Sequence, residues 1–160
     1  MSTTTPTVHA KVKKLAPNLK KSFPRSPRAM LGGYILAARA VDKGRAELAG
    51  TAGEYHFDCP LDNMFLGFAG LKGPDLRDLL ATGADDKAVS QWIEKHATKR
   101  PRIEIIKWNN EWRYKRISET PDRIQEFMED YVPKNVPEAL IPRLVYFFDI
   151  FDAEEKRIKA

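Results

Sequence analysis

Residues 26–62 read SPRAMLGGYILAARAVDKGRAELAGTAGEYHFDCPLD and contain the helix around which we expect the rest of the chain to pack. Residues 34–49 are rich in helix-forming residue types, and Gly50 after them is a typical helix C-cap. The charged residues of this helix share their faces with alanine and leave no clean apolar stripe. We therefore expect a closely packed helix with enclosed polar groups.

Glycines mark both ends of this predicted helix. Gly32 and Gly33 would each cost about 1 kcal/mol inside a helix, so they indicate a break or a close backbone contact. Residues 50–60 contain further glycines and alternate in polarity from Tyr55 to Cys59. This alternation predicts a short extended segment.

The rest of the chain shows helical periodicity interrupted by glycine and proline. Helices are predicted over residues 63–69, 73–83, 85–97, 103–118, 120–131 and 144–157. Residues 1–22 contain much Thr, Lys and Pro and few large apolar residues, which is typical of a flexible arm. The sequence thus predicts a mainly α protein with one short extended segment. Residues 23–160 would form a single compact multi-helix domain, preceded by a flexible basic N-terminal arm.

The composition suits a globular protein. Of the 160 residues, 42% are hydrophobic, which is enough to bury an ordinary core. No apolar run approaches the roughly 20 residues of a membrane-spanning helix, and no apolar signal-peptide core follows the basic N-terminus. The single cysteine, Cys59, cannot form an intramolecular disulfide. These features predict a cytoplasmic protein without a membrane segment.

The net charge of +5 is unevenly distributed. Residues 1–41 hold eight of the 27 basic side chains and none of the 22 acidic ones, so the remainder carries a small negative charge. A basic tail accelerates association with any polyanion without specifying a partner. Weak nucleic-acid contact through the arm is therefore one hypothesis.

Basic side chains of the central stretch could converge on an anion. The candidate ligand-binding residues are Arg28, Arg39, Lys43, Arg45 and Tyr55. Arginine offers a planar fork of donors to carboxylate or phosphate, and lysine offers a compact charge. The alternative is a structural network in which Arg39 pairs with Asp42 and Lys43 pairs with Glu47. Because Arg28 and Arg45 lack acidic partners at such spacings, they are the stronger ligand-binding candidates.

Acid–base groups are concentrated in residues 54–62, where Glu54, Cys59 and Asp62 are the candidate catalytic residues. A carboxylate can transfer protons, and a thiol beside a base can act as a nucleophile. Two of them also have structural interpretations. Cys59 could be a small buried hydrophobe, and Asp62 could cap the helix that follows.

The same segment also contains possible metal ligands. Glu54, His56 and Asp58 would share one face of an extended segment and could supply three ligands. A solvent-facing side of a strand has the same pattern, so no metal site is predicted, and the sequence does not identify a cofactor.

Two aromatic segments each have two interpretations. Residues 95–116 combine eight basic side chains with Trp108 and Trp112. The basic groups could bind phosphates, and the aromatic rings could stack on bases. The same residues could equally form an amphipathic helix whose tryptophans face the core. The cluster at residues 146–148 could be core or the surface of a homodimer.

Several motifs of the central stretch together resemble a known family. They are RSPR at residues 25–28, LGG at 31–33, Arg39 with the DKGRA of 42–46, GEY at 53–55 and CPLD at 59–62. These motifs resemble bacterial proteins grouped as domain of unknown function family 5069. The resemblance covers residues 23–97 and continues weakly to residues 152–155. It implies family membership and no particular reaction or ligand.

Two functions fit these observations. In the first, a small anionic ligand binds in a cleft between the helix of residues 34–49 and the segment of residues 53–62. The candidate arginines would anchor it, Glu54 or Asp62 would supply acid–base chemistry, and both an enzyme and a binding protein fit this hypothesis. In the second, the protein is a non-enzymatic interaction module. Its basic arm and residues 95–116 would then meet nucleic acid or an acidic protein partner.

Overall fold

The computed structural model describes residues 4–159, with side chains from residue 10 onward. The chain separates into two compact units, Met1–Arg100 and Pro101–Ala160. Helices dominate both units, which confirms the prediction of a mainly α protein. Within residues 4–159, no helix is both long and apolar enough to span a bilayer.

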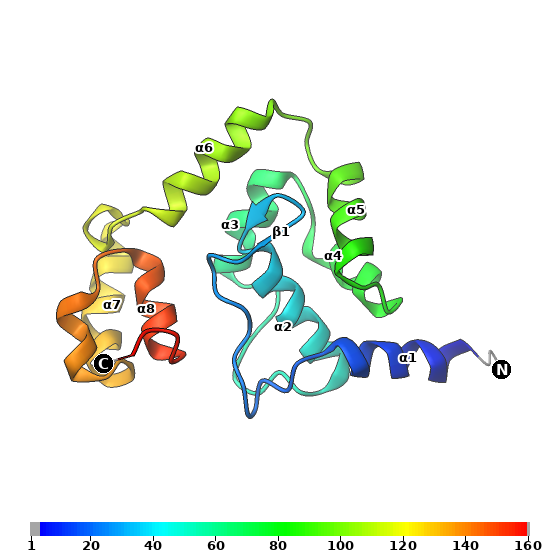
Figure 1. Ribbon diagram of the computed structural model, residues 1–160, viewed down its shortest axis with the longest axis horizontal. Coiled ribbons are helices and arrows are strands. Elements are labelled where there is room, and N and C mark those ends of the chain that lie inside the picture. The colour runs from blue at the N-terminus through cyan, green and yellow to red at the C-terminus, as the bar shows by residue number, and fades with distance from the viewer. Residues whose placement is uncertain (1–3, 160) are drawn as a thin grey trace. The chain divides into compact units, whose positions relative to one another are not determined.

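The elements of the first unit surround a short hairpin and a central helix (Figure 1). Its helices are α1 (Thr4–Leu15), α2 (Ala37–Ala49), α3 (Pro60–Ala69), α4 (Gly73–Ala81) and α5 (Asp86–His96). The strands β1 (Met30–Leu31) and β2 (Tyr34–Ile35) are antiparallel, with Met30 opposite Ile35 and Leu31 opposite Tyr34. The second unit contains α6 (Arg102–Arg113), α7 (Asp122–Asn135) and α8 (Phe147–Glu154), with 3-10 helices η1 (Ile117–Glu119) and η2 (Glu138–Arg143).

Helix α2 is the centre of the first unit. Every residue from Ala37 to Ala46 is buried, and the helix packs against α1, α3 and α4. Gly50 ends the helix with a φ of 75°, and its amide donates to the carbonyls of Ala46 and Glu47. The predicted C-cap and the enclosure of the charged residues among alanines are therefore both present.

The glycine pair before α2 forms the turn of the hairpin. Gly32 and Gly33 have φ values of 62° and 90°, the left-handed region that a tight hairpin turn requires and glycine tolerates. A Cβ at Gly32 would lie 2.9 Å from the Cδ1 of Ile93, so the backbone approaches α5 closely. The helix begins at residue 37 and not 34, because the hairpin takes Tyr34 and the next residue and Leu36 is left-handed.

The extended segment lies at a different position in the sequence from the one predicted. It lies in the hairpin of residues 30–35, whereas residues 50–59 connect α2 to α3 through turns. Gly53 and Asp58 have φ values of 59° and 62°, and such left-handed residues interrupt a strand.

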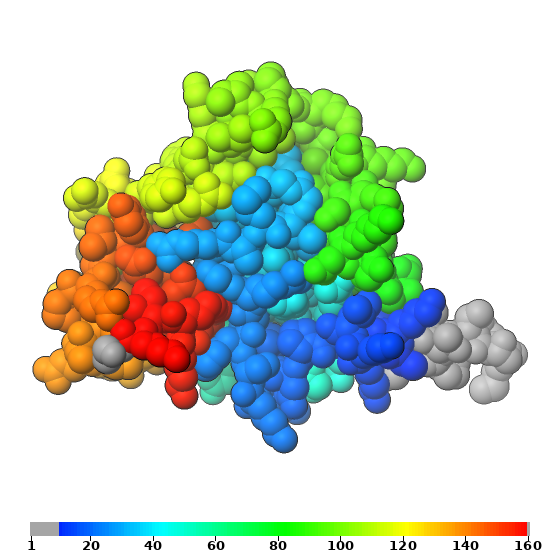
Figure 2. Space-filling model, viewed as in Figure 1, coloured from blue at the N-terminus to red at the C-terminus, as the bar shows by residue number. Residues whose placement is uncertain are grey.

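The N-terminal segment also differs from the flexible arm expected over residues 1–22. Its helix, α1, packs against α2 and α4, and Val12 and Leu19 are buried. The blue surface of α1 adjoins the green residues around the start of α5 in Figure 2. A few apolar side chains among the lysines are enough to dock this segment. Residues 1–3 of the expected arm lie outside the described residues.

The second unit has an aromatic cluster at α8. Phe147 and Phe148 are buried, and the ring of Phe151 meets them edge-on at centroid distances of 5.4 and 6.4 Å. This agrees with the core interpretation of residues 146–148. Helix α7 continues past the predicted end at residue 131 and includes Pro133.

Gly44 has no side chain, and this allows Leu80 and Phe57 to pack closely against α2. Substitution of Gly44 tests how tight this packing is. A Cβ there would lie 2.6 Å from the Cδ1 of Leu80 and 3.1 Å from the Cδ1 of Phe57. Overpacking costs about 1–3 kcal/mol, whereas helix propensity favours alanine by about 1 kcal/mol. We expect Gly44→Ala to lower the free energy of unfolding by up to about 2 kcal/mol in urea titrations.

The matched control is Gly67→Ala, at an exposed position of α3 where a Cβ would meet nothing within 4 Å. Here alanine should be neutral or stabilise by up to about 1 kcal/mol. Equal effects of the two substitutions would show that the contacts at Gly44 do not limit packing.

Candidate functional site

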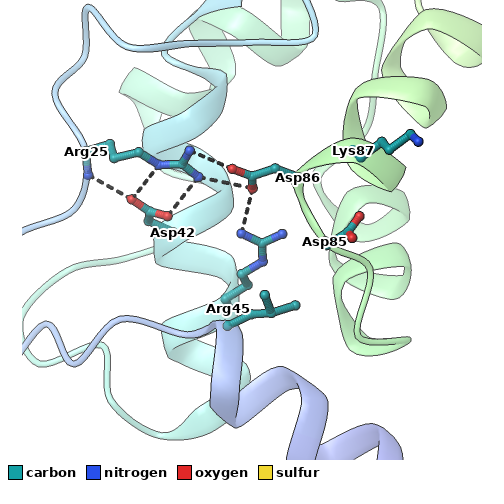
Figure 3. Close-up of a pocket in the computed structure, with 7 residues that line it drawn as sticks. Arg25, Asp42, Arg45, Asp85, Asp86 and Lys87 are labelled. Carbon is teal, nitrogen blue, oxygen red and sulfur yellow. Dashed lines mark hydrogen bonds and ion pairs between the residues drawn. The ribbon is translucent and has the colours of Figure 1, made fainter.

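A pocket of about 450 Å³ opens in the first unit beside the N-terminus of α5. It is lined by Leu15, Arg25, Asp42, Arg45, Asp85, Asp86 and Lys87. The end of α1, the loop before the hairpin, α2 and the start of α5 all contribute side chains (Figure 3). The pocket therefore depends on four segments that are distant in the sequence.

Arg25 holds one carboxylate on each edge of its guanidinium group. Its Nε and Nη2 donate to Asp42 at 3.1 and 3.0 Å, and its Nη1 and Nη2 donate to Asp86 at 2.8 and 3.3 Å. Its backbone amide also donates to Asp42, at 2.8 Å. Burial alone would lower the pKa of Arg25, but these two carboxylates outweigh it and raise that pKa. Such paired contacts are strong and directional, so Arg25 ties its loop to α2 and α5.

Arg45 reaches the same carboxylate from the protein interior. Its side chain is only 4% exposed, and its Nη1 donates to the Oδ1 of Asp86 at 2.9 Å. Its Nη2 donates to the carbonyl of Ala84 at 2.9 Å. Its Nε is buried and has no hydrogen-bond partner among the described residues. A buried donor without an acceptor costs about 1–3 kcal/mol, so this Nε lowers the stability that Arg45 contributes.

The Asp86 carboxylate lies between the two arginines, as Figure 3 shows. Asp86 is the first residue of α5, and its side chain is 45% exposed. Burial alone would raise the pKa of Asp86, but the hydrogen bonds and charges of Arg25 and Arg45 outweigh it. They hold that pKa below its ordinary value of 3.8. The site therefore favours a negatively charged carboxylate at this position.

The start of α5 adds to the positive potential. A helix N-terminus carries a partial positive charge and free amides. Asp85 caps this end, since its side chain accepts from the amide of Ala88 at 2.9 Å. Lys87 is exposed and points away from the two arginines in Figure 3. The side chains that donate to the Asp86 carboxylate are the guanidinium groups of Arg25 and Arg45.

Lys43 belongs to a separate, enclosed cluster. Its Nζ lies 2.8 Å from the Oδ1 of Asp62 in an ion pair, and it donates to the Sγ of Cys59 at 3.2 Å. The side chains of Lys43 and Asp62 are 4% and 1% exposed. The other oxygen of Asp62 accepts from the amide of Asp58 at 2.9 Å. This cluster anchors the first turn of α3 to α2.

The expected cap of α3 is thereby corrected. Asp62 is not the N-cap, because the helix begins at Pro60 and Cys59 occupies the N-cap position. Proline is well suited to a first helical position, where its missing donor costs nothing. Asp62 instead lies in the first turn and faces the buried lysine of α2.

Most of the predicted site residues lie outside this pocket. Arg45 lines the pocket, and Arg28, Arg39, Lys43, Glu54, Tyr55, Cys59 and Asp62 do not. Arg39 is buried, donates to the carbonyl of Arg25 at 3.2 Å and lies 5.7 Å from the ring centroid of Tyr55. It therefore supports the loop that carries Arg25. Glu54 is exposed, and no three His, Cys, Asp or Glu side chains in the described part of the chain gather as metal ligands.

The ion pairs of α2 also differ from those expected within the helix. The pairs formed include Arg25–Asp42, Lys43–Asp62, Arg45–Asp86 and Arg77–Glu47. Each joins α2 to a residue at least 17 positions away. Spacing rules for one helix cannot find such partners, because side chains three or four residues apart compete with partners from other segments.

Sequence reasoning missed Arg25, Asp86 and Lys87 as pocket residues. Two signals were available, since Arg25 begins the RSPR motif and a helix was predicted from residue 85. Neither signal indicated that the loop and the helix start would meet. Their meeting is a product of the tertiary fold.

Basic and aromatic residues of α6 and the turn after it contact one another. Lys115 pairs with Glu111 at 3.2 Å and lies 4.6 Å from the ring centroid of Trp112. Trp108 and Trp112 are both half-buried. Contact between this helix and nucleic acid stays a prediction.

The enclosed pair provides a stability test. Asp62→Asn keeps the size of the side chain but leaves the Lys43 charge buried without its counter-charge. We expect the free energy of unfolding to fall by about 3 kcal/mol or more in urea titrations. The double variant Lys43→Met with Asp62→Asn should lose less than Asp62→Asn alone. If the double variant were less stable than Asp62→Asn, the buried Lys43 charge would not be the cause of the loss.

The lowered pKa of Asp86 predicts a specific pH dependence. Because its folded-state pKa lies below the unfolded value, its contribution is complete above the unfolded pKa and is lost as the pH falls through the folded pKa. We expect Asp86→Asn to cost about 1 kcal/mol near neutral pH. The difference from wild type should shrink toward zero between about pH 4 and about pH 2. Urea unfolding of both proteins across this pH range measures the difference in the free energy of unfolding. A difference that stays constant with pH would refute the prediction.

Comparison with known proteins finds a matching family model. A family model described as Domain of unknown function (DUF5069) matches residues 21–157. A comparison with proteins of curated function finds no match. The matched range includes every pocket residue except Leu15, and it extends through both units of the chain. The chain therefore belongs to the family of domain of unknown function 5069.

Proposed function

We propose that the first unit binds a small molecule through an acid group, carboxylate or phosphate, in the Arg25–Arg45 pocket. One observation carries the proposal. A carboxylate, that of Asp86, already lies between Arg25 and the buried Arg45 at the wall of a pocket of about 450 Å³. The site thus has donors arranged for an oxyanion and adjoining space for the rest of a molecule.

The donors have the chemistry that anion recognition requires. Guanidinium groups match the spacing of two oxygens in a carboxylate or phosphate, and desolvation strengthens such contacts. Arg45 is almost fully desolvated and retains an unused Nε. Pocket volumes of about 300–1,000 Å³ are usual for small-molecule sites, so the size is suitable.

The charges of the lining favour a small ligand over a polyanion. Asp42, Asp85 and Asp86 balance the three basic residues of the pocket. A nucleic-acid backbone passing over this surface would meet these carboxylates, and like charges repel. A small molecule brings a single acid group to the two arginines and meets fewer of these carboxylates than a polyanion does.

The proposal concerns binding. The candidate acid–base groups Glu54 and Asp62 do not line the pocket, and Asp62 is occupied by its ion pair with Lys43. No catalytic role is assigned to either of them at this site.

Arg45→Lys tests the proposal because it keeps the charge and removes the planar fork. We would titrate acetate and inorganic phosphate at constant ionic strength and follow backbone amide shifts at residues 85–88 by NMR. Losing a charged hydrogen bond costs about 1.5–3 kcal/mol, so affinity should fall about tenfold or more.

The matched control is Arg77→Lys, which alters an arginine that pairs with Glu47 outside the pocket. Its affinity for either anion should equal that of the wild type. Equal affinities in wild type and Arg45→Lys would remove the anion site from this pocket.

A further inference from the structure

We infer, on the basis of the proposed function, that the acid group of the ligand is a carboxylate and that it takes the position now occupied by the Asp86 carboxylate. This position, between the Nη atoms of Arg25 and the Nη1 of Arg45, is called the carboxylate subsite. Asp86 is then an internal competitor that occupies the subsite until a ligand displaces it.

The donors of the subsite suit a planar group with two oxygens. The Nη1 and Nη2 of Arg25 face the two oxygens of Asp86 at 2.8 and 3.3 Å, and the Nη1 of Arg45 meets one of them at 2.9 Å. This is the two-point geometry of an arginine–carboxylate pair with a third donor added.

The subsite does not depend on Asp86 for its shape. Asp42 fixes Arg25 through the backbone amide, the Nε and the Nη2. Arg45 is fixed by burial and by the carbonyl of Ala84. Both guanidinium groups therefore stay in place when Asp86 leaves, and such preorganisation lowers the cost of binding.

Asp86 can leave without unfolding its helix. Its side chain is 45% exposed, and the cap of α5 is made by Asp85, which accepts from the amide of Ala88. Rotation of the Asp86 side chain toward solvent breaks its contacts with the two arginines and leaves this cap intact. The cost of displacement is thus confined to the contacts that the ligand replaces.

The negative charges around the subsite favour a carboxylate over a phosphate. A carboxylate replaces the charge of Asp86 one for one within the subsite. Phosphate brings a further oxygen and, near neutral pH, further negative charge close to Asp42, Asp85 and the displaced Asp86. Like charges at such range are unfavourable, so the ligand class is a small carboxylic acid. Leu15 and the remaining wall are available to its other atoms.

Asp86→Ala empties the subsite and tests the inference directly. We would titrate the full-length wild type and variant with sodium acetate, and separately with inorganic phosphate, at an ionic strength held constant with sodium chloride. The NMR shifts of the amides of residues 85–88 report binding. An intramolecular group acts at an effective concentration in the millimolar range or above, so its removal should raise acetate affinity at least about tenfold. Phosphate should bind the variant more weakly than acetate does, because Asp42 and Asp85 remain.

Asp75→Ala is the matched control. It removes another exposed aspartate from the first turn of a helix, α4, outside the pocket. Its acetate affinity should equal that of the wild type. If circular dichroism shows that Asp86→Ala is unfolded, Asp86→Asn provides the comparison. It keeps the side-chain shape, removes the competing charge and should raise acetate affinity in the same direction.

The outcomes distinguish this inference from the proposed function. Acetate binding that depends on Arg45 but is no tighter in the Asp86 variant would overturn the competitor and leave the anion site intact. Tighter binding of phosphate than of acetate in the variant would overturn the carboxylate class. Binding of neither anion to wild type or variant would overturn both proposals.

Discussion

The first unit depends on the pairing of charges that α2 buries. Arg39, Asp42, Lys43 and Arg45 are all buried on this one helix. A buried charge costs several kcal/mol unless another group satisfies it, so each needs a partner in a defined position. The partners come from the loop after α1, from α3 and from the start of α5. The requirement for pairing therefore orders the segments around α2.

The same requirement produces two clusters with different properties. The Lys43–Asp62 pair is closed, with both side chains almost fully buried, and it fastens α3 to α2. The cluster of Arg25 and Arg45 opens onto a pocket, and its bridging residue, Asp86, is half-exposed. Removing one partner of the closed pair would leave a buried charge without its counter-charge. In the open cluster, the Asp86 side chain reaches water and rotates without that penalty.

Some elements were predictable because their signals are local. Gly50 ends α2 as expected, since glycine tolerates a left-handed conformation. The helix predicted from residue 85 is also present as α5, whose N-cap is Asp85. The glycine turn at residues 32–33 was also marked by composition. The start of α2 was misplaced because the hairpin competes with helix propensity at Tyr34. The N-terminal segment was expected to be flexible because its few apolar residues gain burial only when α2 and α4 are present.

The sequence by itself determined the helical class, the family and the C-terminal end of α2. These follow from residue types and spacings within a few positions of one another. Only the tertiary structure brought Arg25 and Asp86 to Arg45, and paired Lys43 with Asp62 in place of Glu47. The physical reason is that a buried charge takes the partner that packing places beside it. That partner is set by which segments meet, and helical periodicity carries no information about it.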